Sequence, residues 1–145
     1  MSGRTASCLC GAIKIEIQGS PFLQNLCHCE SCQKYTGATF GTMAAYKNEQ
    51  LKFTESEADV LKTYNDTTPE SGGTLKRSFC GNCGSPVRVQ SSKNPGASVI
   101  PVGIIDGGKD DFKPQIEFFC KRKAGWVGAI EGAKTVDAMP DFSSE

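Results

Sequence analysis

The chain has 145 residues, enough for one domain with a single core, and its sixteen basic residues balance sixteen acidic ones. This neutral charge does not favour a nucleic-acid or membrane-surface binder. The first residues contain no apolar segment typical of a secretory signal, and no run of about 18 apolar residues follows. We therefore expect a soluble cytoplasmic or nuclear protein, with one domain over 1–136 and a flexible tail over 137–145.

Short strands are predicted along most of the chain. Residues 12–19 alternate Ile13, Ile15 and Ile17 with polar residues, the pattern of a strand with one buried face. Further runs rich in β-branched or aromatic residues, bounded by turn residues, cover 38–46, 60–64, 74–79, 86–91, 97–103 and 114–122. Helical turns are expected at 30–37 and near 104–112, a loop at 65–73 and a turn at 91–96. The sequence thus predicts a mainly β domain of short antiparallel strands with few helical turns.

Seven of the eight cysteines fall into three tight groups. Cytosolic and nuclear compartments keep thiols reduced, so such clusters favour metal binding over disulfides. Cys8 and Cys10 directly precede the strand at 12–19, and residues i and i+2 of a strand share one face. Cys80 and Cys83 form a Cys-x-x-Cys-Gly turn, in which glycine tolerates a left-handed backbone. Together these four thiolates predict a closed, tetrahedral structural zinc site.

The stretch "CHCESC" holds the third group, Cys27, Cys29 and Cys32. Three thiols within one local turn and no obvious fourth ligand are typical of a zinc site with an open coordination position, which catalysis requires. His28 or Cys120 could close the site instead. However, His28 would point to the opposite face of a strand, and Cys120 lies in an apolar run where we expect it to be buried.

Two further alternatives stay open at the level of the sequence. Cys80 and Cys83 could pair with two cysteines of the third group, because spacing alone does not exclude that arrangement. Sulfur ligands also suit iron as well as zinc. Seven thiolates and two Zn²⁺ ions would leave the neutral chain with a net negative charge, which further disfavours nucleic acid as a partner.

Four parts of the chain, "CLCGAIKIEI", "CHCESCQKYTG", "RSFCGNCGSPV" and Trp126, resemble the family of glutathione-dependent formaldehyde-activating enzymes, which also includes centromere protein V. The resemblance spans residues 6 to 127 and rests on the order and spacing of seven cysteines. It implies a mainly β, Mss4-like fold, also called a β-tent, with two zinc ions. It also implies a structural zinc on Cys8, Cys10, Cys80 and Cys83 and a catalytic zinc on Cys27, Cys29 and Cys32.

The founding activity of that family joins glutathione to formaldehyde. The resemblance therefore implies a zinc-dependent carbon–sulfur lyase acting on adducts of glutathione, or of another thiol, with formaldehyde or a small electrophile. Two alternatives are a non-catalytic glutathione- or thiol-binding zinc module and a zinc-stapled protein-interaction domain. Beyond the metal ligands, we expect Lys34 at the surface, Tyr35 at the core edge, Gly37 at the end of the helical turn, and Trp126 packed in the core or at its rim.

Overall fold

The computed structural model describes residues 3–140, which form eleven strands, two α-helices and three 3₁₀ turns. The strands are β1 (Arg4–Ser7), β2 (Ile13–Ile17), β3 (Leu23–Cys27), β4 (Gly41–Lys47), β5 (Leu51–Glu55), β6 (Leu61–Asp66), β7 (Leu75–Cys80), β8 (Pro86–Ser91), β9 (Asn94–Pro101), β10 (Ile116–Phe118) and β11 (Lys134–Thr135). The helices are α1 (Glu30–Thr36) and α2 (Gly108–Asp111), and the 3₁₀ turns are Asn48–Gln50, Val102–Ile104 and Cys120–Arg122. The predicted mainly β fold is confirmed; residues 141–145 of the predicted tail lie outside the described residues.

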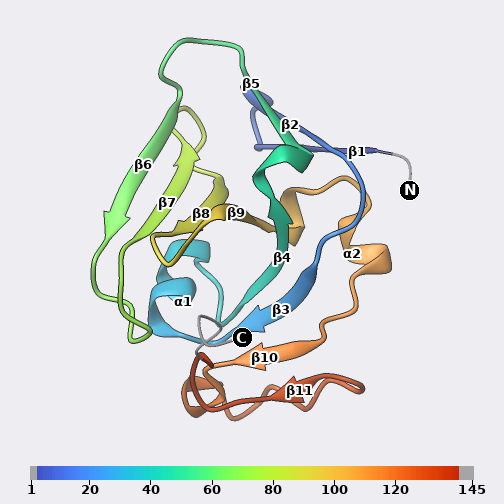
Figure 1. Cartoon of the computed structure of the whole chain (residues 1–145), viewed down its shortest axis with the longest axis vertical. Coiled ribbons are helices and arrows are strands. Elements are labelled where there is room, and N and C mark those ends of the chain that lie inside the picture. The colour runs from blue at the N-terminus through green and yellow to red at the C-terminus, as the bar shows by residue number, and fades with distance from the viewer. Residues whose placement is uncertain (1–2, 141–145) are drawn as a thin grey trace.

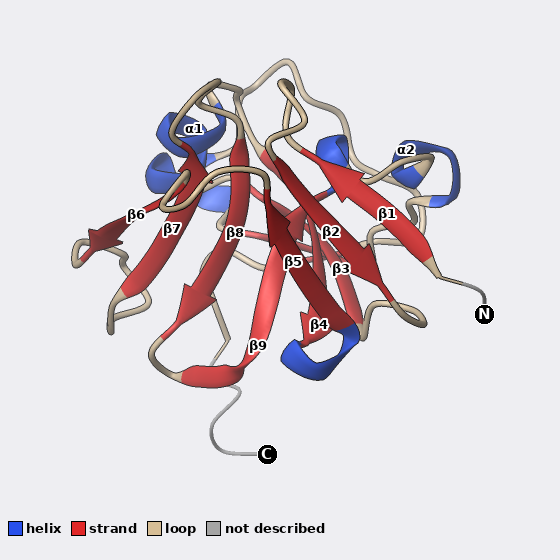
Figure 2. Ribbon diagram, turned by 90° about the horizontal axis from the view of Figure 1, so that it is seen from above, coloured by secondary structure: helices blue, strands red, loops and turns tan. Residues whose placement is uncertain are grey.

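The strands form two sheets. β1, β2 and β5 make a three-stranded antiparallel sheet, and the other eight strands follow the order β11-β10-β3-β4-β9-β8-β7-β6. Pairing in the larger sheet is antiparallel except at β10, which runs parallel to both β3 and β11. In Figure 1 the small sheet lies at the top, β10 and β11 lie at the bottom, and α1 lies at the lower left. Figure 2, seen from above, shows β2 and β5 in front of β3 and β4.

The main hydrophobic core lies between the two sheets. Ile13, Ile15 and Ile17 of β2 are at most 1% exposed, whereas the side chains between them face solvent, as the alternating pattern predicts. They belong to one buried cluster with Val87 of β8 and Ile100 of β9. Full burial of each such side chain stabilises the fold by roughly 1.5–3 kcal/mol. This core fixes β2 against β8, and so it also fixes the loops at the ends of β1 and β7.

The structure differs from the predicted strand at 114–122. Only β10 within this run is extended, because Phe119 adopts a left-handed backbone with φ of 58° and Cys120 then begins a 3₁₀ turn. A run of aromatic residues indicates burial, and Phe118 and Phe119 are indeed buried, but burial does not require a continuous strand.

Four strands, β1, β3, β5 and β11, were not predicted. β1 contains only Arg4, Thr5, Ala6 and Ser7, and it is extended because its backbone pairs with β2 in register Arg4 to Ile17. β3 carries a buried Asn25 where an apolar residue would mark a strand. These strands are set by partners elsewhere in the chain, which a local pattern does not reveal.

Candidate metal centres

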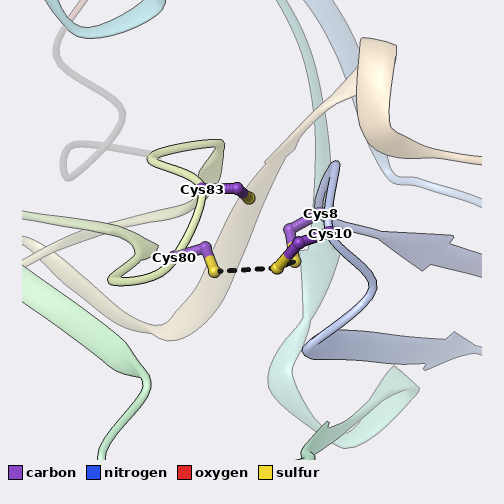
Figure 3. Close-up of side chains that lie close together, drawn as sticks. All are labelled: Cys8, Cys10, Cys80 and Cys83. Carbon is purple, nitrogen blue, oxygen red and sulfur yellow. Dashed lines mark hydrogen bonds between the residues drawn. The ribbon is translucent and has the colours of Figure 1, made fainter.

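The structure brings Cys8, Cys10, Cys80 and Cys83 together from two loops. Cys8 and Cys10 lie in the turn between β1 and β2, rather than in a strand, and Cys80 and Cys83 lie at the turn between β7 and β8. Figure 3 shows the four side chains gathered in one place between these loops. The Sγ atom of Cys10 lies 3.7 Å from the Sγ atoms of both Cys8 and Cys80. This group therefore joins the small sheet to the large one.

The geometry of this group suits a tetrahedral metal ion. Thiolates bound to zinc at about 2.3 Å in a tetrahedron lie about 3.8 Å apart, close to the sulfur separations of 3.7 Å seen here. The backbone amide of Ile13 donates to the Sγ of Cys8 at 3.3 Å. The Ser85 hydroxyl lies 3.3 Å from the Sγ of Cys83 and, through this hydrogen bond, lowers the pKa of Cys83 to about 5. These contacts favour the thiolate forms that a metal requires.

Cys27, Cys29 and Cys32 form a second group at the junction of β3 and α1. Cys27 ends β3, Cys29 is the N-cap of α1, and Cys32 lies in its first turn. The Sγ of Cys29 accepts a hydrogen bond from the Cys32 amide at 3.3 Å, so the sulfur of Cys29 also caps the helix. The helix ends at Gly37, as predicted. Gly37 has a left-handed backbone with φ of 69°, and its amide donates a hydrogen bond to the Gln33 carbonyl.

Within this group the Cys27 thiol donates to the Sγ of Cys29, with 3.4 Å between the sulfurs. Hydrogen bonding from Cys27 lowers the pKa of the Cys29 thiol to about 3, and the same contact raises the pKa of Cys27. Cys29 is partly exposed, while Cys27 and Cys32 are buried. The three Sγ atoms all lie within 4.8 Å of one another, and both cysteine groups can hold a metal ion.

No further histidine, cysteine or carboxylate joins Cys27, Cys29 and Cys32 within residues 3–140. Neither fourth ligand considered from the sequence takes that position, because His28 and Cys120 lie together in a separate group. Cys80 and Cys83 lie with Cys8 and Cys10 in the four-cysteine group. The alternative, in which they pair with two cysteines of the three-cysteine group, is therefore not the arrangement of this fold.

His28 instead belongs to a buried hydrogen-bond network that sequence reasoning missed. Its Nε2 lies 2.9 Å from Oε1 of Glu117, both side chains are 0% exposed, and Lys123 Nζ lies 3.0 Å from the same oxygen. Burial alone would raise the pKa of Glu117, but hydrogen bonds from His28 and Lys123 outweigh it and lower that pKa. The contact holds the loop after β3 against β10. An acidic residue inside the apolar run "IEFF" was the signal available in the sequence.

Cys120 is not the buried small hydrophobe that we expected. It is partly exposed, and its thiol donates to the Glu117 backbone carbonyl at 3.5 Å. Trp126 is 74% exposed, so it is not a core residue either. Both lie in the segment between β10 and β11, which contains no strand.

Arg77 on β7 is the second residue that sequence reasoning missed. Its side chain is 5% exposed, its Nε donates to Oδ2 of Asp66 at 2.9 Å, and its Nη1 lies 3.9 Å from the Sγ of Cys32. The guanidinium carbon lies 5.3 Å from the centre of the Tyr35 ring, within cation–π range. A fixed positive charge therefore lies beside the three-cysteine group. "LKRSFC" gives no local signal for this, because it looks like any strand with a surface arginine.

Tyr35 lies partly buried between α1 and the large sheet, as expected of a core-edge residue. Its hydroxyl donates to the Ser78 carbonyl at 2.6 Å and accepts from the Val87 amide at 3.1 Å. Burial raises the pKa of Tyr35 to about 12, so the hydroxyl keeps its proton near neutral pH. Tyr35 thus fixes α1 on β7 and β8. It is not placed to exchange a proton with a ligand.

Fold and site together define a class: a small, mainly β protein with one four-cysteine group and one three-cysteine group, each able to hold a metal ion. The family model described as "Glutathione-dependent formaldehyde-activating enzyme" matches residues 3–122, and the chain belongs to this family.

A solved crystal structure of a Rhodobacter sphaeroides protein has a similar fold. Its TM-score is 0.57 at 24% sequence identity, and the match covers 76% of this chain and 96% of that chain. No curated protein matches the sequence. None of the helices within residues 3–140 is long and apolar enough to cross a membrane.

Proposed function

We propose that this chain is a two-zinc enzyme of the carbon–sulfur lyase type, acting on adducts of glutathione, or of another thiol, with formaldehyde or a small electrophile. The observation that carries the proposal is the three-cysteine group, which has no fourth protein ligand among the described residues. Three protein ligands and an open position are typical of catalytic zinc, whereas four cysteines are typical of structural zinc. Membership of the family supports this division of roles.

Residues of the chain itself would hold the metal ion of the open site and set the charge around it. Zinc held by Cys27, Cys29 and Cys32 would supply a Lewis acid that favours the thiolate form of an incoming thiol or polarises a carbonyl oxygen. The three ligand thiolates would exceed the charge of a divalent ion by one, and the Arg77 guanidinium, which is itself paired with Asp66, lies beside this excess. Because Asp66 holds Arg77, the positive charge stays beside Cys32.

The proposed reaction is an addition that needs no oxidant or reductant. The sulfur of the thiol forms a bond to the aldehyde carbon, the carbon–oxygen π bond breaks, and the thiol proton moves to that oxygen. The reverse reaction breaks the carbon–sulfur bond. Tyr35 does not carry the proton, because its hydroxyl already donates a hydrogen bond to the Ser78 carbonyl.

Native mass spectrometry of protein purified without added metal tests the metal assignment. We expect two zinc ions per chain and one bound glutathione, with the glutathione and one zinc lost together in Cys29→Ala. An iron signal, or glutathione binding that survives in Cys29→Ala, would contradict the proposed site.

Turnover requires its own measurement, because glutathione and formaldehyde also combine without a catalyst. Exchange NMR with ¹³C-formaldehyde and glutathione would compare the wild-type protein with Cys29→Ala at equal concentration. Faster exchange with the wild-type protein only is the expected result. Glutathione bound at the second zinc without faster exchange would favour the non-catalytic thiol-binding module instead.

A further inference from the structure

Arg88 on β8 carries a charge that no other described residue neutralises. It is one of four arginines in the chain, and each of the other three pairs with a carboxylate: Arg4 with Asp111, Arg77 with Asp66, and Arg122 with Glu70. The side chain of Arg88 forms no ion pair with any residue in 3–140, and its buried Nε has no hydrogen-bond partner there. Arg88 is therefore the arginine whose guanidinium is left for a ligand from outside the chain.

The partial burial of Arg88 makes the missing partner costly. Its guanidinium carbon lies 4.3 Å from the centre of the Phe53 ring on β5. Burial lowers the pKa of Arg88, because the charged form loses water without gaining an acidic neighbour. The cation–π contact with Phe53 contributes attraction, but a neutral ring does not cancel the charge. An anion bound beside Arg88 would supply the missing counter-charge.

Arg88 lies on the face of the large sheet opposite to the three-cysteine group. It stands directly across from Ser78 of β7, and Ser78 stands across from Thr63 of β6, so these three side chains share one face. Arg77 precedes Ser78 and faces the other way, toward Cys32. Figure 2 shows β6, β7 and β8 extending to the left of β5, beyond the edge of the three-stranded sheet. A ligand on Arg88 would therefore lie across the sheet from the metal site proposed as catalytic.

The strand positions around Arg88 on this face carry no acidic side chain. The register places Lys76 of β7 between Gln90 of β8 and Asn65 of β6, one row along from Ser78. Lys76 is exposed and forms no ion pair within residues 3–140. Diagonal neighbours on adjacent strands are about 7–8 Å apart, within reach of a long side chain. Two cations therefore share this face, and nothing on these three strands neutralises them there.

Glu55 at the end of β5 is the acidic residue that faces this region from the small sheet. It shares a face with Phe53, and its Oε1 accepts a hydrogen bond from the Leu61 amide at 2.9 Å. Glu55 forms no ion pair with Arg88, and no carboxylate raises the pKa of that guanidinium. The carboxylate of Glu55 is thus held by the backbone of β6 and leaves Arg88 uncompensated.

The groups on this face suit a phosphate better than a carboxylate. An arginine guanidinium binds the oxygens of either anion in pairs. A phosphate group carries about 1.5–2 negative charges at neutral pH and several acceptor oxygens. It can therefore also accept from the ammonium group of Lys76 and from a neutral donor such as the Gln90 amide, whereas the two oxygens of a carboxylate are used by the guanidinium.

We propose that Arg88 and Lys76 form a binding site for a phosphate group, either free phosphate or a small phosphate monoester. Arg88 makes the direct paired contact, and Lys76 adds a second charge from β7. The site does not depend on the proposed function, because it involves neither zinc nor a thiol and lies on the other face of the sheet.

An NMR titration of the zinc-loaded, ¹⁵N-labelled full chain with sodium phosphate tests the site, with the ionic strength held constant by sodium chloride. We expect saturating shifts of the Ser78, Arg88 and Gln90 amides. Arg88→Met should weaken phosphate binding about tenfold, the effect of losing a charge-assisted contact. Lys76→Met should weaken it about threefold, because an exposed charge contributes less.

Two further anions define the ligand class. Glycerol 2-phosphate distinguishes the sources of the phosphate group: binding as tight as that of phosphate, or tighter, supports a monoester, and weaker binding supports free phosphate. Acetate should bind more weakly than either. Acetate that binds as tightly as phosphate would overturn the assignment to phosphate.

Lys62→Met is the matched control. Lys62 lies next to Thr63 on β6, is exposed, and projects to the opposite face of the sheet, so its removal changes the net charge without touching the site. It should bind phosphate like the wild-type protein. An equal loss of affinity in Arg88→Met and Lys62→Met, or no loss in Arg88→Met, would overturn the proposed site.

Cys29→Ala separates this site from the metal, because phosphate oxygens also bind zinc. This variant should keep the phosphate-dependent shift of the Arg88 amide. Loss of that shift in Cys29→Ala, or shifts confined to α1 in the wild-type protein, would assign the phosphate to the metal and overturn the site on Arg88.

Thermal melting tests whether Arg88 serves the fold alone. In chloride, Arg88→Met should melt at or above the midpoint of the wild-type protein, because methionine keeps the packing on Phe53 and removes an unpaired charge. Phosphate should raise the midpoint of the wild-type protein only. A variant that is less stable in chloride and gains as much from phosphate as the wild-type protein would show that Arg88 is structural.

Discussion

Nη1 of Arg77 lies 3.9 Å from the Sγ of Cys32, and the Nε of the same guanidinium donates to Asp66 at 2.9 Å. Arg77 and Cys32 are 45 positions apart in sequence, and they meet because Tyr35 holds α1 against β7. The arginine thus links a structural ion pair to the three-cysteine group. This relationship makes Asp66 important for stability and for the charge beside the proposed catalytic zinc.

Replacement of Asp66 by alanine should destabilise the protein strongly. Asp66 and Arg77 are both nearly buried, and removal of one partner leaves the other charge buried without compensation. We expect the free energy of unfolding of the zinc-loaded protein to fall by about 3–5 kcal/mol in urea titrations. Glu70→Ala is the control, because Glu70 pairs with Lys121 and Arg122 at the surface, and its removal should lower the stability far less. Equal losses in both variants would contradict this account.

The two cysteine groups should differ in their effect on folding. Cys80→Ala breaks the group that joins the β1–β2 turn to the β7–β8 turn, and we expect a zinc ion to be lost together with much of the stability. Cys29→Ala removes a ligand at one helix end only, so we expect loss of the other zinc ion and a smaller drop in the thermal midpoint. Zinc content by mass spectrometry and melting by circular dichroism measure both effects. If Cys29→Ala unfolds as readily as Cys80→Ala, the three-cysteine group is structural.

Glu117→Gln tests the buried network around His28. The carboxylate of Glu117 bonds to His28 and Lys123, and hydrogen bonds that involve charged groups contribute more than neutral ones. Loss of the charge should lower the free energy of unfolding by about 2–3 kcal/mol in urea. Glu131→Gln, at an exposed position, provides the control and should change the stability little. A Glu117→Gln protein as stable as this control would show that the network contributes nothing to folding.

Gly37→Ala should cost about 1 kcal/mol, measured by urea denaturation. Gly37 has a φ of 69°, and a Cβ added there meets nothing within 4 Å, so the cost comes from the backbone conformation alone. A Cβ added at Gly96 also meets nothing within 4 Å, but the backbone of Gly96 is not left-handed. Gly96→Ala should therefore be nearly neutral, and a similar loss in both variants would rule out the conformational explanation.

The sequence by itself determined the features that depend on residues close together in the chain. The alternation around Ile13 predicted the buried face of β2, because successive side chains of a strand point to opposite faces of the sheet. The spacing of the cysteines predicted tight groups that a reducing compartment would leave free for metal, and their order carried the family resemblance. The helical turn ending at Gly37 was equally local, since glycine adopts the left-handed cap at little cost.

Only the tertiary structure decided which distant residues meet. Cys10 and Cys80 are 70 positions apart, and the sulfur of each could have faced other partners until the two sheets packed together. Arg77 beside Cys32, Glu117 beside His28, and the extended conformation of β1 all depend on the register and packing of the sheets. Charges and polar side chains have no sequence period that reveals their partners, because long-range contacts form wherever hydrophobic burial places the backbone.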